Sequence, residues 1–233
     1  MIDATKLNQL QTNSVIADSA LLGQFYAFSP YFIGGTFVTA GDINYDGVPD
    51  IIVGAASGGG PHVKVIDGTK LGLMQATGQI ADQALLAQFY AFDPSFTGGV
   101  NVAYAMSQSG AVEIIAGAGA GGGPHVKVID ASKLNQVQSN SQIADSALLG
   151  QFYGFNPAFT GGVDVAGVDV NGDGIPDLIL AAGPGSGPHI RVVNGNSLNQ
   201  AQSDGQIVTS ALLDDFFAGL SNNTGGLTVG GRI

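Results

Sequence analysis

An all-β fold made of repeated four-stranded antiparallel sheets is predicted by three features of this sequence. Short runs rich in Val, Ile, Phe and Tyr recur along its 233 residues, and turns rich in Gly, Asp and Pro separate them. The 37 glycines follow no G-X-Y period, which excludes a collagen triple helix and indicates many tight turns. A block of about 64 residues also repeats along the chain, which is typical of propellers, solenoids and arrays.

The repeat is visible in two blocks of sequence. GGGPHVKVID begins at Gly58 and at Gly121, and GSGPHIRVVN begins at Gly185, so the histidines inside them are 63 and 64 residues apart. QFYAF and its variants QFYGF and DFFAG begin at Gln24, Gln88, Gln151 and Asp215. We interpret the chain as one repeat domain, 1–233, with about three and a half copies: repeat 1 at 1–65, repeat 2 at 66–128, repeat 3 at 129–192 and partial repeat 4 at 193–233.

Each unit is predicted to contain four strands, A to D. In the first unit these are Phe37–Ile43 (A), Asp50–Ala56 (B), His62–Asp67 (C) and the QFYAF block (D). The links A–B and B–C are short and suit antiparallel hairpins. The longer link from C to D predicts an irregular hairpin extension or a helical turn, the latter near Ala17–Leu22.

Four antiparallel strands repeated at this spacing, without helices between them, are the sequence form of β-propeller blades. A solenoid or a stacked sandwich is the competing arrangement. Counting a strand D at the start and a strand A at Leu227–Gly231, the sequence predicts fourteen strands. Closed propellers typically have about four to eight blades, so we expect an incomplete ring. Either copies associate to close it, with a homodimer favoured, or the chain is part of a longer array.

Two acidic loops between strands A and B share the pattern D-x-N-x-D-G-x-x-D. They are DINYDGVPD at Asp42–Asp50 and DVNGDGIPD at Asp169–Asp177. The pattern matches the first six positions of an EF-hand loop, in which oxygens at alternate positions converge on Ca²⁺ and the glycine permits the sharp turn. Position twelve is Val53 or Leu180, inside an apolar strand, so each loop joins two strands rather than two helices.

With these loops, and with strand B ending in IIVGAA, the sequence resembles the FG-GAP/VCBS repeats of bacterial surface proteins and integrin α-subunit propellers. The resemblance implies a Ca²⁺-stabilised propeller with the metal loops on one face and the B–C and D–A loops, where ligands bind, on the other. By position, the implied ligands are Asp42, Asn44, Asp46, the Val48 carbonyl and Asp50, then Asp169, Asn171, Asp173, the Ile175 carbonyl and Asp177. An Asp/Asn-Gly turn without metal is the alternative.

The second repeat departs from this pattern. Its A–B loop lies within Ala105–Glu113, AMSQSGAVE, and counted from Met106 to Glu113 it is one residue shorter than the acidic loops. Only Glu113 matches an acidic position, while Met106, Gln108 and Ser109 fill the others. We therefore expect no calcium in this loop.

The glycines of the second repeat resemble a nucleotide-binding loop, but the residues that follow them exclude one. Gly117, Gly119 and Gly122 spell G-x-G-x-x-G after a strand, but a dinucleotide loop must open a helix. Here a Pro and alternating β-formers follow, and the other repeats lose the spacing. We interpret these glycines as a B–C turn that also lets neighbouring blades approach closely.

The remaining repeated side chains are expected to be structural. We expect His62, His125 and His189 to form turn or blade contacts, with hydrogen bonding to a ligand as the alternative. The basic residues two positions later, Lys64, Lys127 and Arg191, are expected to be solvated strand charges. The aromatic residues of the QFYAF blocks are expected to pack between blades.

Charge and composition limit the function classes. The net charge of −11, from 18 acids and 7 bases, argues against nucleic acid and anionic membranes as partners and favours cations. The chain has no cysteine, and no window approaches 18 apolar residues, so we expect no membrane insertion. We expect no signal peptide in this chain, because MIDATKLNQL lacks a basic and an apolar region, and the resemblance implies an extracellular or cell-surface location.

The expected function is that of a non-enzymatic calcium-binding module with a binding, adhesion or structural role and a carbohydrate or protein ligand. One alternative is a self-assembling propeller unit without a ligand. The other is the scaffold of a calcium-dependent enzyme acting on polysaccharides, which needs a cluster of unlike catalytic groups that breaks the repeat symmetry. The sequence shows no such cluster.

Overall fold

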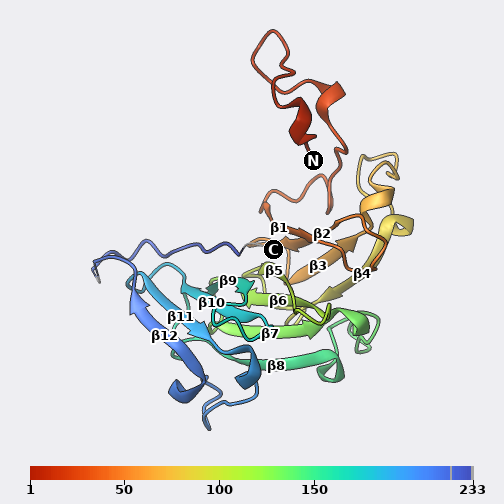
Figure 1. Ribbon diagram of the computed structural model, residues 1–233. Coiled ribbons are helices and arrows are strands. Elements are labelled where there is room, and N and C mark those ends of the chain that lie inside the picture. Colours follow the sequence, from red (N-terminus) through yellow and green to blue (C-terminus); the bar gives the residue numbers. More distant parts are fainter. Residues whose placement is uncertain (221, 232–233) are drawn as a thin grey trace.

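The computed structural model describes residues 1–220 and 222–231, and it confirms the all-β fold class. The described residues form three four-stranded antiparallel sheets, each in the strand order of the chain (Figure 1). The first holds β1 (Thr36–Gly41), β2 (Asp50–Ala55), β3 (His62–Ile66) and β4 (Leu85–Tyr90). The second holds β5 (Val100–Met106), β6 (Val112–Ala118), β7 (His125–Asp130) and β8 (Leu148–Tyr153). The third holds β9 (Val163–Val168), β10 (Asp177–Ala182), β11 (His189–Val193) and β12 (Leu212–Phe217).

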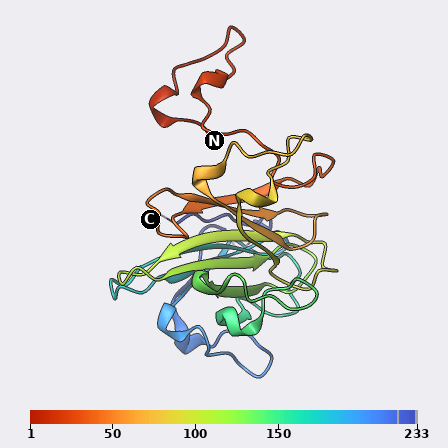
Figure 2. The same ribbon diagram turned by 90° about the vertical axis from the view of Figure 1, so that its right-hand side faces the viewer.

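The sheets are arranged as successive blades. Their first strands lie innermost, since β1 contacts β5 and β5 contacts β9, and no strand is shared between sheets. Figure 2 shows the blades stacked in layers, while the N-terminal segment extends away from them. The described chain therefore forms an open arc of three blades rather than a closed ring.

The link from the third to the fourth strand of each blade contains both predicted features. Each link has two short 3₁₀ helices, and a hairpin-like bridge such as Met74↔Ile80 lies between them. An aspartate or asparagine caps the first helix, as Asp67 does by accepting the Thr69 N–H. The helices are η1 (Ala4–Lys6), η2 (Asp18–Ala20), η3 (Gly68–Lys70), η4 (Asp82–Ala84), η5 (Ala131–Lys133), η6 (Asp145–Ala147), η7 (Gly195–Ser197) and η8 (Thr209–Ala211).

The hydrophobic core lies mainly between blades. One cluster joins the first and second blades through residues such as Ile52, Phe89 and Ile114. Another cluster joins the second and third blades. The blades approach closely at strand-B glycines: a Cβ at Gly117 would lie 2.6 Å from the Val163 carbonyl oxygen of the next blade. This contact confirms that these glycines serve blade packing.

Two of the fourteen predicted strands are absent from the described structure, which has twelve. Gln24–Phe28 makes only a bridge between Tyr26 and Gln79, and Leu227–Gly231 has no strand assignment. Both errors have the same cause. A β-strand needs a neighbouring strand that hydrogen-bonds to it along its length, and neither segment has such a neighbour among the described residues. The strand in the QFYAF block was also misplaced: β4 begins at Leu85, three residues before the block, and ends at Tyr90.

Candidate functional site

The first acidic loop connects β1 to β2 and coils around the side chain of Asp42. The Asp46 N–H donates to one oxygen of the Asp42 carboxylate at 3.2 Å, and the Gly47 N–H donates to the other at 2.9 Å. Gly47 has φ of +84°, a left-handed conformation that favours glycine and turns the chain sharply. The loop therefore folds back on its first aspartate.

The other polar side chains of this loop turn toward the same interior. The Asn44 side-chain oxygen accepts the Asp46 N–H at 3.0 Å, and the Asp46 carboxylate accepts the Val48 N–H at 2.8 Å. The Asn44 amide nitrogen lies 3.0 Å from the second Asp46 oxygen. Oxygen atoms from loop positions one, three and five are thus brought together, while the loop itself remains exposed.

The second acidic loop, between β9 and β10, repeats this arrangement. The Asp169 carboxylate accepts N–H bonds from Gly172, Asp173 and Gly174 at 2.7, 3.1 and 2.8 Å. Asn171 lies 3.0 Å from Asp173, as Asn44 does from Asp46. This loop has one further contact, because the Asn196 amide of η7 donates to Asp173 at 2.9 Å.

The ninth-position aspartates have different surroundings from the other acids. Asp50 is fully buried, and its two oxygens accept the N–H groups of Ile43 at 2.8 Å and Gly68 at 2.9 Å. Burial raises the pKa of this carboxyl above its ordinary value. Asp177 is equally buried and accepts from Val170 and Gly195 at 2.9 Å. These two side chains tie each acidic loop to the turn that follows strand C.

A hard, oxygen-preferring cation fits the donor set at the first, third and fifth positions. Each loop offers two carboxylates and an amide oxygen there, and the seventh-position carbonyl comes from the exposed end of the same loop. The ninth-position acid faces backbone N–H groups instead. Accordingly, the described residues include no group of three histidine, aspartate or glutamate side chains placed to hold a metal together.

The A–B loop of the second blade is a neutral turn. Ser107 and Ser109 hydrogen-bond to each other through their hydroxyls at 2.8 Å, and the Ala111 N–H donates to Ser107. Glu113 pairs with Ala105 across the hairpin, as Asp50 pairs with Gly41, so it holds the ninth-position place. Its Oε2 atom is buried without a hydrogen-bond partner among the described residues. Burial, followed by repulsion from Asp130, raises the pKa of Glu113 to about 7.

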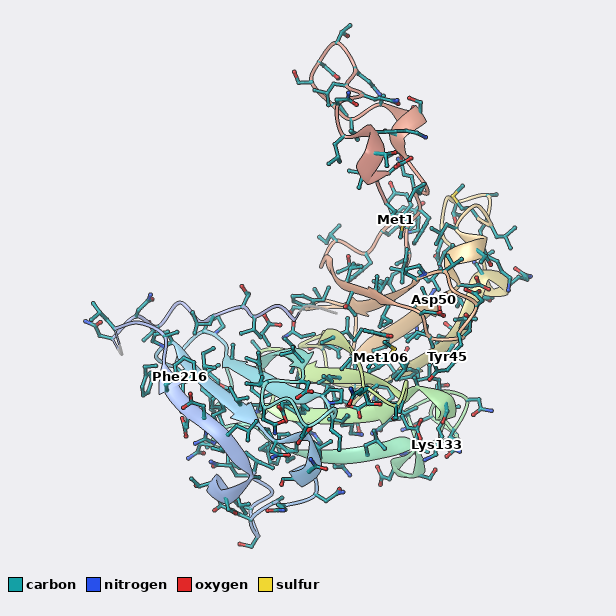
Figure 3. All side chains as sticks on the ribbon, viewed as in Figure 1. Met1, Tyr45, Asp50, Met106, Lys133 and Phe216 are labelled. Carbon is teal, nitrogen blue, oxygen red and sulfur yellow. The ribbon has the colours of Figure 1, made fainter. Side chains whose placement is uncertain are left out.

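The three A–B loops lie side by side on one face of the arc. The Tyr45 hydroxyl donates to the Gly110 carbonyl at 2.9 Å, and the Gln108 N–H donates to the Gly174 carbonyl at 2.8 Å. Figure 3 labels Tyr45 of the first acidic loop and Met106, the last residue of β5 before the neutral loop. The neutral turn therefore separates the two acidic loops and contacts both.

The opposite face carries the B–C and D–A loops and a pocket of about 320 Å³. These loops are hydrogen-bonded to each other, as in the bond from the Gly58 N–H to the Thr97 carbonyl at 2.8 Å. Asn101 lines the pocket, and its side-chain oxygen is buried without a hydrogen-bond partner among the described residues. This pocket lies on the face where the resemblance implies a ligand.

The repeated histidines lie between aromatic rings at the contacts between successive repeats. His62 lies between Phe28 and Tyr90, with ring centroids 5.3 and 4.9 Å apart. His125 lies between Phe92 and Tyr153, and His189 between Phe155 and Phe217. Burial, then the nearby lysine, lowers the pKa of both His62 and His125 to about 4. His62 and His125 are therefore neutral near pH 7.

The expectation that the adjacent basic residues are solvated is wrong for Lys64 and Lys127. Their side chains lie over the rings of Phe28 and Phe92, and the residues are only 4% and 3% exposed. Alternation along these strands predicts that one side of the sheet faces solvent. At Lys64 and Lys127, however, the aromatic residues of the preceding repeat cover that side. Arg191 is also mostly covered and pairs with Asp215.

The described part of the chain contains no helix long and apolar enough to cross a membrane.

Comparison with known proteins gave one match to a family model, the FG-GAP repeat, at residues 161–207. No curated protein and no solved structure matched the chain. The matched segment contains the whole second acidic loop, strands β10 and β11, and Asn196 of η7. The match confirms the resemblance that the loop motifs and the repeated four-stranded sheets indicated. Residues 161–207 of this all-β repeat chain therefore match the FG-GAP repeat model.

Proposed function

We propose that this chain is a non-enzymatic calcium-binding propeller module that acts in binding or adhesion outside the cell. One observation carries the proposal: the acidic loop at Asp169–Asp177 lies within the FG-GAP match and folds its oxygen side chains inward. The loop at Asp42–Asp50 makes the corresponding hydrogen bonds from the N–H groups of Asp46, Gly47 and Val48. Carboxylate and amide oxygens of this kind are the ligands that Ca²⁺ prefers.

Calcium would be held in the first loop by Asp42, Asn44, Asp46 and the Val48 carbonyl, and in the second by Asp169, Asn171, Asp173 and the Ile175 carbonyl. Asp50 and Asp177 would either turn toward the ion and complete these sites, or keep the hydrogen bonds to backbone N–H groups that they make in this structure and so hold the loops in place. When bound, calcium supplies positive charge that offsets repulsion between the loop carboxylates. It would thereby fix the link between the first two strands of the blade.

The stabilisation expected from calcium is large enough to measure. Extracellular modules bind calcium with Kd values of roughly 10⁻⁴–10⁻³ M. At calcium about 100-fold above Kd, one site stabilises the folded state by about 2.7 kcal/mol. For a chain of this length, that corresponds to a rise in Tm of roughly 5–10 °C per site.

Calorimetric melting with calcium and with excess chelator tests the proposal. The parent chain is expected to lose several degrees of Tm on chelation, and the double variant Asp46→Ala, Asp173→Ala is expected to show no response to calcium. Ser109→Ala, at the corresponding place in the neutral loop, is the matched control and should behave like the parent. A parent Tm that is the same with and without calcium would rule out the calcium sites.

The family match supports the proposed location, and the pocket on the face of the B–C and D–A loops supports the proposed ligand. FG-GAP repeats are typical of extracellular proteins, which supports a role outside the cell. The pocket that Asn101 lines offers polar groups for a carbohydrate or protein ligand on the B–C and D–A face. The absence of a catalytic role is part of the proposal, and a turnover screen with acidic polysaccharides is its direct test.

A further inference from the structure

A second pocket, of about 280 Å³, lies between the N-terminal segment and the first blade. Phe28, Ser29 and Phe32 line it from the N-terminal segment, and His62 and Lys64 line it from β3. It shares no residue with either proposed calcium site. Its lining combines aromatic rings with one positive charge.

Lys64 has no carboxylate partner in this pocket. Its residue is 4% exposed, and its ammonium lies 5.6 Å from the centre of the Phe28 ring. Among the described residues, no hydrogen bond or ion pair to this ammonium is found, and the acid that acts on it electrostatically, Asp82, is exposed on η4. A buried ammonium without a counter-charge is unfavourable, because burial removes its hydration.

The third blade shows how the same position is neutralised within the protein. Strand pairing places Lys64 opposite Gln88, Lys127 opposite Gln151, and Arg191 opposite Asp215. In the third blade the Arg191 Nε atom lies 3.2 Å from the Asp215 carboxylate, and His189 hydrogen-bonds to the same carboxylate. The first blade has the neutral amide of Gln88 where the third blade has this carboxylate.

We propose that the pocket at Lys64 binds the carboxylate of an external ligand, in the role that Asp215 has in the third blade. The Lys64 ammonium donates to the carboxylate, and the neutral His62 ring can donate one further N–H. The rings of Phe28 and Phe32 provide an apolar wall for the rest of the ligand. This assignment does not depend on calcium binding.

Histidine ring NMR tests the proposal, because the chain has only three histidines. The holoprotein in saturating calcium is titrated with sodium acetate, with ionic strength held constant by sodium chloride. Acetate is expected to shift the His62 ring signals in a saturable way, and acetamide, its neutral counterpart, is expected not to. His189 should not respond in the same manner, because Asp215 already neutralises its site.

Two variants separate ligand binding from a structural role of the lysine. Lys64→Gln removes the positive charge, and Gln88→Asp adds the carboxylate that the third blade has. Both are expected to weaken the acetate response of His62 by at least about tenfold, the loss of one charge-assisted contact. If Lys64→Gln does not fold, Gln88→Asp alone decides the question.

The proposal is overturned if His62 shows no saturable response to acetate in the parent chain, or if the response persists in Gln88→Asp. Repeating the titration with galacturonic acid shows whether a sugar ring carrying the carboxylate binds more tightly than acetate. Repeating it in the Asp46→Ala, Asp173→Ala variant keeps the two proposals distinct. The acetate response is expected to survive there even if the calcium response is lost or was never present.

Discussion

Glu113 shows most clearly how one residue changes the chemistry of a blade. The aspartates at the same place in the other blades, Asp50 and Asp177, are buried but accept backbone N–H groups. Glu113 is buried with one oxygen unpartnered, and its pKa is raised to about 7. A longer side chain on a shorter loop has therefore lost the bonds that compensate for burial.

This difference gives a pH-dependent prediction. Because the folded-state pKa of Glu113 is raised above its ordinary value, the folded chain holds the proton more tightly than the unfolded chain. The stability associated with this carboxyl is thus present at low pH and is lost as pH rises from about 4.5 toward 7. Glu113→Gln removes that loss, and it should raise the free energy of unfolding by about 1–3 kcal/mol at pH 8. At pH 4.5 the effect should be close to zero.

Urea denaturation of the parent and the Glu113→Gln variant at both pH values measures this effect, with calcium constant. Taking the difference between the two proteins cancels the titration of the other acids. An equal difference at pH 4.5 and pH 8 would show that Glu113 ionises normally in the folded chain.

At the scale of the element, each acidic loop rests on the turn after strand C. A Cβ at Gly68 would lie 2.2 Å from the Pro49 carbonyl oxygen, and Gly195 has the same relation to Pro176 at 2.1 Å. The second blade has Ala131 at this place, beside its shorter neutral loop. The glycine is therefore needed where the longer acidic loop packs against the turn.

Gly68→Ala is predicted to weaken calcium binding at the first loop by about tenfold, because displacing the turn also displaces the Asp50 carboxylate that braces the loop. Calcium titration by calorimetry in the Asp173→Ala background isolates the first site. Ala131→Gly in the second blade is the control and should leave the affinity unchanged. An unchanged affinity in Gly68→Ala would mean that this packing does not support the site.

Elements also show what the sequence could and could not predict. Strands A, B and C were located closely, since short turns and β-branched residues mark their ends. The pattern of the acidic loops likewise predicted which side chains gather around Asp42 and Asp169. The burial of Lys64 was missed, because alternation along a strand indicates a solvent face only when one side of the sheet is open. The backbone bonds of Asp50 were missed as well, since one of them comes from Gly68, eighteen residues away.

At the scale of the whole molecule, one contact between successive repeats is made three times. Tyr26, Tyr90 and Tyr153 each bond through their backbone to the C–D link of the next repeat, for example from the Tyr90 N–H to the Ser141 carbonyl and from the Ile143 N–H to the Tyr90 carbonyl, both at 2.9 Å. In the third blade the equivalent residue is Phe217, which pairs with His189 as Tyr90 pairs with His62. Phe217 is 52% exposed, and the equivalent link near the N-terminus is exposed at residues 11–15 and half-buried at Ile16.

Because both halves of this contact are exposed, we predict that copies of the chain associate head to tail, with Phe217 of one copy against residues 11–16 of another. Such a contact is heterologous, so it gives a closed ring if the rotation between copies closes and a longer assembly if it does not.

Light scattering at increasing protein concentration should show a mass above the 23.4 kDa of one chain. Phe217→Asp should restore the single-chain mass, since it places a charge in the apolar contact. Tyr31→Asp, at a residue that is more exposed but outside this contact, should associate like the parent. A single-chain mass for the parent at every concentration would contradict the prediction, and association that persists in Phe217→Asp would assign the contact to another surface.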